Sequence, residues 1–126
     1  MTGEKAADER KMKLEDAVKD YAGRLNDADA SSSVTGPCGD SMEFYLNFDG
    51  DRIKEVRYHA DGCDITRACG AIVAFHADGR TIEEAFFISP GLLLRTLGKV
   101  PEDHRHCAIL ACTSFFRAVA DRLLEP

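Results

Sequence analysis

The feature that most constrains the fold is a run of strictly alternating residues followed by a tight-turn sequence. Over residues 42–48, apolar and polar side chains alternate at every position, which is the pattern of a strand with one buried face. Residues 49–50 are Asp-Gly, a strong signal for a hairpin turn. A return strand is expected over residues 52–60, with a bulge because Ile53 is out of phase with Val56.

Helical patterns surround this hairpin. An amphipathic helix is expected over residues 11–26, after a frayed lead of residues 1–10, and the Ser-rich residues 27–36 are expected to be a linker. Behind the hairpin, further helical segments are predicted around residues 65–75, after a capping box of Thr81 and Glu84, over residues 90–97, and from about 101–106 to 124. This order predicts an α+β fold, a small antiparallel β-sheet packed against several α-helices, in one domain of residues 1–126.

Charge and composition exclude several functional classes. The 16 basic and 22 acidic residues give a net charge of −6, which disfavours nonspecific binding to nucleic acid or to anionic membranes. No apolar run approaches the roughly 18 residues that a bilayer crossing needs. Residues 1–19 lack the apolar core of a signal peptide, so we expect a cytoplasmic protein with neither nucleic acid nor membrane as a partner.

The sequence contains an odd number of cysteines, which favours metal binding or thiol chemistry over a disulfide framework. There are five: Cys38, Cys63, Cys69, Cys107 and Cys112. In the last predicted helix, Cys112 falls within an apolar stripe and is interpreted as a small buried hydrophobe. The other members of this stripe are Ile109, Phe116, Val119, Ala120 and Leu123.

Cys107 falls outside that stripe. It lies about 200° from Ile109 around the helix, so core packing does not account for it. It also lies in the first helical turn, where the helix dipole is expected to lower the pKa of a thiol and to produce a nucleophile or a metal ligand. The adjacent His106 is a candidate ligand or base.

Three further candidates flank the hairpin. Cys38 and Asp40 precede the first strand and Cys63 follows the second, so an antiparallel hairpin brings them to one end of the sheet. If the start of the last helix docks there, Cys107 completes a three-thiolate site. Thiolates with one carboxylate or imidazole suit zinc or an iron–sulfur cluster. Cys69 is interpreted first as a core residue, although a role as an auxiliary thiol stays open.

The sequence resembles the iron–sulfur cluster assembly scaffold family of the IscU and NifU N-terminal-domain type. The resemblance covers roughly residues 36–124. Four motifs carry it: Gly-Pro-Cys-Gly-Asp at 36–40, Gly-Cys-Asp-Ile at 62–65, Gly-Arg-Thr-Ile-Glu-Glu-Ala at 79–85 and His-Cys-Ala-Ile-Leu-Ala at 106–111.

The resemblance implies a fold, a site and a function. The fold is that of the IscU and SufE type, with helices covering a small antiparallel sheet. Cys38, Cys63 and Cys107 would accept sulfur and bind iron, Asp40 would tune the lability of the cluster, and His106 would be an alternative ligand. The chain would take sulfur from a cysteine desulfurase, build a 2Fe–2S or 4Fe–4S cluster and pass it to apo-proteins, as a carrier rather than an enzyme. Zinc can occupy the cluster-free site, and a homodimer stays open.

The chain departs from the family pattern in two places. The N-terminal family motif is absent, and residues 99–104 replace the chaperone-recognition motif, so recognition by an Hsp70-type chaperone is not expected. Two other functions stay open beside the scaffold. One is a structural zinc module on the same ligands, and the other is a persulfide carrier that activates a desulfurase without building a cluster.

Overall fold

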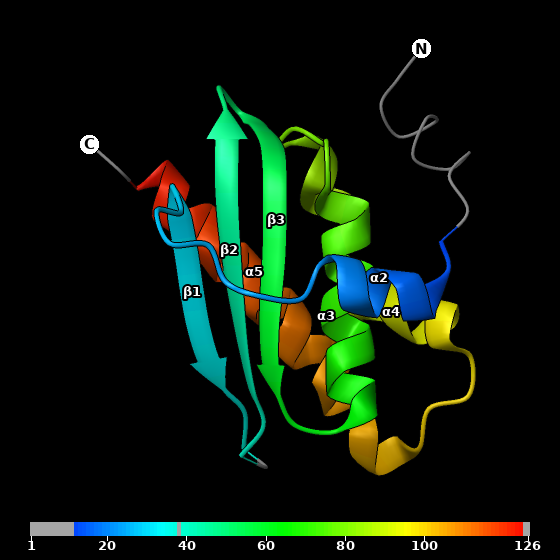
Figure 1. The fold of residues 1–126 in the computed structure, drawn as a ribbon. Coiled ribbons are helices and arrows are strands. Elements are labelled where there is room, and N and C mark those ends of the chain that lie inside the picture. The colour runs from blue at the N-terminus through cyan, green and yellow to red at the C-terminus, as the bar shows by residue number, and fades with distance from the viewer. Residues whose placement is uncertain (1–11, 38, 125–126) are drawn as a thin grey trace.

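The computed structural model describes residues 12–37 and 39–124 (Figure 1). The elements follow in the order α2 (Leu14–Asp20), β1 (Ala30–Thr35), β2 (Ser41–Asp49), β3 (Arg52–Asp61), α3 (Asp64–Ala77), the 3₁₀ helix η1 (Glu84–Phe87), α4 (Pro90–Leu97), the 3₁₀ helix η2 (Glu102–His104) and α5 (His106–Leu123). Over these described ranges, the strands form one antiparallel sheet in the order β1–β2–β3. The predicted α+β class is therefore confirmed.

The hairpin of β2 and β3 forms as the alternation predicts. Pairing jumps from Asn47–Glu55 to Phe48–Ile53, so Lys54 is the extra residue of a bulge. The bulge lets Ile53 and Val56 both point into the core, where each is fully buried. The bulge predicted from their mismatched phase is therefore confirmed.

Residues 27–36 are not the expected linker. Most of this segment is the edge strand β1, which pairs antiparallel with β2 from Ala30–Leu46 to Thr35–Ser41. The side chains of β1 are mostly small and hydroxylated, so the sequence lacks an apolar strand signal. The Ser32 hydroxyl instead donates to the Ser114 carbonyl at 2.6 Å, which ties β1 to α5.

The N-terminal helix is shorter than predicted. It was expected over residues 11–26, but α2 ends at Asp20, and Lys11 lies outside the described residues. Beyond α2 the chain bonds to the edge of the sheet: Tyr58 N–H donates to the Tyr21 carbonyl, and Gly23 N–H donates to the Tyr58 carbonyl. These bonds replace the next helical turn. The predicted lead of residues 1–10 also lies outside the described residues, and the single-domain assignment stays a prediction.

Helices α3 and α5 cover one face of the sheet, and α2 packs against α3 (Figure 1). The core lies between these layers, where Phe44 of β2 meets Phe115 of α5 edge to face at 5.7 Å. Gly70 lets α3 approach closely, because a Cβ there would lie 2.8 Å from the ring of Tyr58.

The buried face of α5 differs from the predicted stripe. Ile109 and Leu123 were expected in the core, but they are 57% and 60% exposed. Alanine, cysteine and serine make up most of the buried face, together with Leu110, Phe115 and Val119, and this face packs against β1 and β2. The buried positions on α5 are Cys107, Ala108, Leu110, Ala111, Cys112, Ser114, Phe115, Ala118 and Val119.

Local signals in the connecting segments behave as predicted. Thr81 and Glu84 form the reciprocal capping box, with N–H to side-chain distances of 3.0 and 3.1 Å. The turn that this box closes leads into η1, a 3₁₀ helix that begins at Glu84. Ser89 caps α4 by accepting from Leu92 N–H at 3.2 Å. Among the described residues, no helix is long and apolar enough to cross a membrane.

The topology gathers four chain segments at one end of the molecule. The start of β2, the end of β3 and the starts of α3 and α5 all lie at the lower end of the view in Figure 1. The outermost pair of the hairpin there is Ser41 with Asp61. Residues directly beyond these element ends are therefore neighbours, as the hairpin argument predicts.

Candidate metal centre

Asp40 approaches this end of the molecule from a tight turn before β2. Gly36 N–H donates to the Asp40 carbonyl at 2.8 Å, and Gly39 N–H donates to the Gly36 carbonyl at 3.1 Å. Gly39 has a φ of +93°, a conformation that other residues rarely adopt. This turn fixes the backbone that carries the Asp40 carboxylate. The third residue of the Gly-Pro-Cys-Gly-Asp motif, Cys38, lies outside the described residues.

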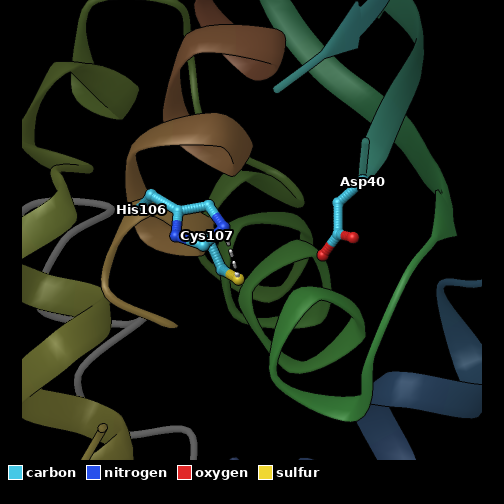
Figure 2. Close-up of side chains that lie close together, drawn as sticks. All are labelled: Asp40, His106 and Cys107. Atoms are coloured by element: carbon cyan, nitrogen blue, oxygen red, sulfur yellow. Dashed lines mark hydrogen bonds between the residues drawn. The ribbon is translucent and has the colours of Figure 1, made fainter. Parts of the chain in front are cut away.

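His106 and Cys107 are the first two residues of α5. The Cys107 Sγ lies 3.9 Å from the His106 Nε2. Figure 2 shows the Asp40 carboxylate on the other side of the site from these two side chains, on the segment that leads into β2. One ligand atom from each of Asp40, His106 and Cys107 can be chosen such that all three lie within 4.8 Å of one another. The structure therefore brings together three of the five ligand candidates predicted from the sequence.

Cys63 stands beside this group rather than inside it. It is the residue before the first turn of α3 and is half-buried. Its Sγ lies 3.5 Å from the Oγ1 of Thr66, and the same oxygen lies 3.3 Å from the Cys107 Sγ. Cys63 thus contacts the group through Thr66 and also interacts directly with Cys107.

Thr66 is a site residue that the sequence reasoning missed. Its side chain is fully buried, and its hydroxyl donates to the Asp40 Oδ2 at 2.6 Å. One signal could have found it: Thr66 lies three residues after Cys63, so the two share a face of α3.

The pKa values of the two site thiols are shifted in opposite directions. The hydrogen bond from Thr66 lowers the pKa of Cys63 below its ordinary value. Burial raises the pKa of Cys107, although its hydrogen bond with Thr66 acts in the opposite direction. The prediction that the start of the helix lowers the pKa of Cys107 is therefore wrong, because Cys107 lies on the buried face of α5 and loses more by desolvation than it gains.

Cys69 and Cys112 belong to the core. Both are buried, and burial raises the pKa of each to about 12. The interpretation of Cys112 as a small hydrophobe is confirmed. The same interpretation holds for the position of Cys69, while its role as an auxiliary thiol stays a prediction.

The donor set fits a soft metal ion. Zinc binds sulfur at about 2.3 Å and nitrogen or oxygen at about 2.0–2.2 Å in tetrahedral geometry, so two ligands of one ion lie roughly 3.3–3.8 Å apart. The widest spacing in the grouping within 4.8 Å would therefore close by about 1 Å around a bound ion. A thiolate, an imidazole and a carboxylate are ligands that zinc and iron both accept.

Comparison with known proteins identifies similar chains. The family described as NifU-like N terminal domain matches residues 10–123. The iron–sulfur cluster assembly scaffold proteins IscU 1 and IscU 2 of Archaeoglobus fulgidus are each 34% identical over 100 residues, which is 79% of this chain and 65% of theirs. This chain thus spans just under two thirds of their length.

Two further comparisons cover a different function and the fold. The zinc-dependent sulfurtransferase SufU of Bacillus subtilis is 28% identical over 67 residues, which is 53% of this chain and 46% of that protein. The crystal structure of the N-terminal part of a nitrogen-fixing NifU-like protein from Brucella abortus superposes with a TM-score of 0.71 at 17% identity. That match covers 90% of this chain and 92% of the other, and it shows a shared fold.

Proposed function

Because the chain belongs to the family described as NifU-like N terminal domain, we propose that it is a scaffold on which an iron–sulfur cluster is assembled. In this role it is a carrier rather than an enzyme, since the cluster is a cargo that is built on the protein and passed to an apo-protein. The observation that carries the proposal is the convergence of Asp40, His106 and Cys107, with ligand atoms within 4.8 Å of one another.

The proposed ligands differ in how strongly they bind an iron–sulfur cluster. Thiolates of Cys63 and Cys107 are soft ligands that suit iron and a cluster, and Cys38 joins them on the strength of its motif. Asp40 is a hard oxygen donor and so the weakest partner for such a cluster, while His106 is an alternative fourth ligand. This donor set is compatible with a 2Fe–2S or a 4Fe–4S cluster, and with zinc when no cluster is bound.

A cysteine desulfurase is the proposed source of sulfur. A thiolate of the scaffold attacks the outer sulfur of the desulfurase persulfide, a new S–S bond forms, and the desulfurase cysteine leaves as a thiolate. The step moves one sulfur atom without net oxidation or reduction. Cys38, Cys63 and Cys107 are the proposed acceptors, and apo iron–sulfur proteins are the proposed recipients of the finished cluster.

Anaerobic reconstitution with iron and sulfide tests the scaffold. Iron, acid-labile sulfide and visible absorbance are measured for the wild type and for the Cys38→Ala, Cys63→Ala and Cys107→Ala variants. We expect a cluster on the wild type and its loss in each of these variants, because each substitution removes a thiolate.

Cys112→Ala is the matched control. It makes the same change on the same helix at a position that is also buried, but Cys112 belongs to the core rather than to the site. We expect this variant to keep its cluster. A Cys107→Ala variant that holds as much cluster as Cys112→Ala would contradict the proposed site.

A second candidate function is zinc-dependent sulfur transfer, in which the chain carries persulfide sulfur without building a cluster. Two observations favour it: the similarity to the Bacillus subtilis protein, and a ligand grouping compact enough for one ion. Zinc that resists chelators, together with no cluster on the wild type after reconstitution, would select this function. Unfolding on zinc removal would instead indicate a structural zinc module.

A further inference from the structure

One atom contacts three of the proposed ligands. The Oγ1 of Thr66 lies 2.6 Å from the Asp40 Oδ2, 3.3 Å from the Cys107 Sγ and 3.5 Å from the Cys63 Sγ. The three ligands come from the turn before β2, the start of α5 and the start of α3. Thr66 therefore joins three separate chain segments at the candidate metal centre.

The hydroxyl group matches these three partners. A threonine hydroxyl donates one proton and accepts at two lone pairs. Its proton goes to the Asp40 carboxylate in the structure, and it can turn to the sulfur of Cys63 or Cys107 when that group is a thiolate. Such a charge-assisted hydrogen bond is stronger than one between neutral groups.

The hydrogen bond of Thr66 joins residues that are distant in the sequence. Thr66 lies in the first turn of α3, where no preceding turn of the helix offers a carbonyl to its hydroxyl. Thr66 instead donates to a residue 26 positions earlier in the chain, although its side chain is fully buried. Its polar group is thus directed at the site rather than at its own backbone.

Thr66 also orients the side chain of Asp40. The hydrogen bond holds Oδ2 and so restricts the rotation of the carboxylate plane. Groups that orient metal ligands in this way typically change metal affinity by 10- to 100-fold when they are removed.

We infer that Thr66 is a positioning residue, which holds Asp40, Cys63 and Cys107 in the arrangement that binds metal. The inference rests on the proposed function, because it assumes that these three residues are ligands. Thr66 does not itself ligate the metal. It acts through Asp40 first, since that hydrogen bond is the shortest of its three contacts.

Cobalt binding to the full chain tests this role. Co²⁺ has visible absorption bands that report the number of thiolate ligands and the coordination geometry. Its dissociation constant is measured by competition with a chelator at fixed pH for the wild type, Thr66→Val and Thr66→Ser. We expect Thr66→Val to weaken binding by roughly 10- to 100-fold and to shift the bands, and Thr66→Ser to restore both, because serine keeps the hydroxyl.

Ser114→Ala is the control for a purely structural effect. Ser114 is also fully buried, and its hydroxyl donates to the Met42 carbonyl at 2.9 Å, away from the proposed ligands. We expect this variant to lower the melting temperature and to leave cobalt affinity unchanged. If Thr66→Val behaves in the same way, the positioning role is wrong.

A double-mutant cycle with Asp40→Ala tests whether Thr66 acts through the carboxylate. We expect most of the effect of Thr66→Val on cobalt affinity to disappear in the Asp40→Ala background. Equal effects in both backgrounds, or a Thr66→Ser variant as weak as Thr66→Val, would overturn the inference.

The outcomes for the inference and for the proposed function are separate. A wild type that binds cobalt but builds no cluster argues against the scaffold and leaves the Thr66 comparison intact. A wild type that builds a cluster, with a Thr66→Val variant that binds cobalt equally well, overturns the inference alone. A wild type that binds no cobalt overturns both.

Discussion

Gly62 lies so close to the Asp40 carboxylate that a Cβ at residue 62 would stand 2.6 Å from Oδ2 and 3.1 Å from the Oγ1 of Thr66. The loop between β3 and α3 thus closes over the hydrogen bond between Asp40 and Thr66. Only a residue without a side chain leaves that bond intact. In the Gly-Cys sequence at 62–63, Cys63 is therefore a proposed ligand, and Gly62 leaves space for the carboxylate of Asp40, the second proposed ligand.

The first prediction is that Gly62→Ala impairs metal binding more than it impairs folding. The new methyl group would meet the end of a flexible side chain, so the Asp40 carboxylate can swing away at little cost in stability. We expect cobalt affinity to fall roughly tenfold or more, with a melting temperature close to that of the wild type. Gly36→Ala is the control, since a Cβ there would meet its nearest neighbours at an ordinary 3.7 Å. Equal affinity of the two variants would contradict the prediction.

A second prediction concerns how long a cluster stays bound. Asp40→Ala removes the hard oxygen donor, which is the weakest ligand for a soft cluster and the natural point of attack for an incoming acceptor. His106 then remains as the nearby nitrogen donor. We expect the cluster absorbance of Asp40→Ala to decay more slowly than that of the wild type, and its transfer to an acceptor to be slower. Decay and transfer at the wild-type rate would show that Asp40 is not the labile ligand.

A third prediction is an order of thiol reactivity. Cys63 is half-buried, and its hydrogen bond with Thr66 lowers its pKa, whereas burial raises the pKa of Cys69 and Cys112 to about 12. The thiolate is the reactive form, so in the metal-free native protein we expect iodoacetamide at pH 8 to modify Cys63 at least about a hundredfold faster than either core cysteine. Peptide mass mapping measures the rates. Labelling in denaturant is the control, because all the thiols should then react alike.

The fourth prediction is a loss of stability at alkaline pH. A thiol whose pKa is raised on folding contributes stability that is present below its unfolded pKa of about 8.5, and that is lost as the pH rises toward its folded pKa. For Cys69 and Cys112 this window runs from about pH 8.5 to the folded pKa of about 12. Each thiol lowers the free energy of unfolding by up to about 1.4 kcal/mol per pH unit in this window.

Urea unfolding at pH 7, 9 and 10.5 measures this dependence. We expect the free energy of unfolding of Cys112→Ala to fall less steeply with pH than that of the wild type, because the variant has lost one of these titrating groups. Parallel pH profiles for the two proteins would count against the burial of this thiol.

The fifth prediction distinguishes the observed face of α5 from the one that hydrophobicity alone suggests. Leu110 is buried, while its neighbour Ile109 is 57% exposed. Leu110→Ala should lower the free energy of unfolding by about 2–5 kcal/mol, and Ile109→Ala by at most about 0.5 kcal/mol. Urea unfolding of this matched pair checks the orientation of the helix. A larger loss of stability for Ile109→Ala than for Leu110→Ala would contradict the observed orientation of α5.

Local signals in the sequence predict much of the fold. The hairpin follows from alternation and an Asp-Gly turn, its bulge follows from the phase of Ile53 and Val56, and the capping box follows from the spacing of Thr81 and Glu84. Each of these signals is contained within a few neighbouring residues, so no long-range information is needed to interpret it.

Features that depend on contacts between distant residues are not predicted by local sequence patterns. The strand β1 (Ala30–Thr35) is held by pairing with β2 and by hydrogen bonds to α5, and its own serines carry no strand signal. Likewise, much of the buried face of α5 is made of alanine, cysteine and serine, so a stripe chosen by hydrophobicity places Ile109 in the core and Cys107 outside it.

The candidate site shows the same division. The hairpin topology places Asp40 near Cys63, and motif order adds His106 and Cys107. Thr66 is missed, because its spacing of three residues from Cys63 does not by itself indicate a role, and that role depends on the Asp40 carboxylate 2.6 Å away. The raised pKa of Cys107 is not predicted for a similar reason, because burial depends on the tertiary structure.

Cluster transfer tests the central claim most directly. The wild type is reconstituted anaerobically with iron and sulfide, freed of excess reagents and mixed with an apo-ferredoxin, and the recipient is assayed for its cluster. The scaffold account predicts that the recipient gains the cluster as the chain loses it, and that a Cys107→Ala protein treated in the same way transfers none. A wild type that takes up only zinc, or that transfers no more cluster than Cys107→Ala, would contradict the account.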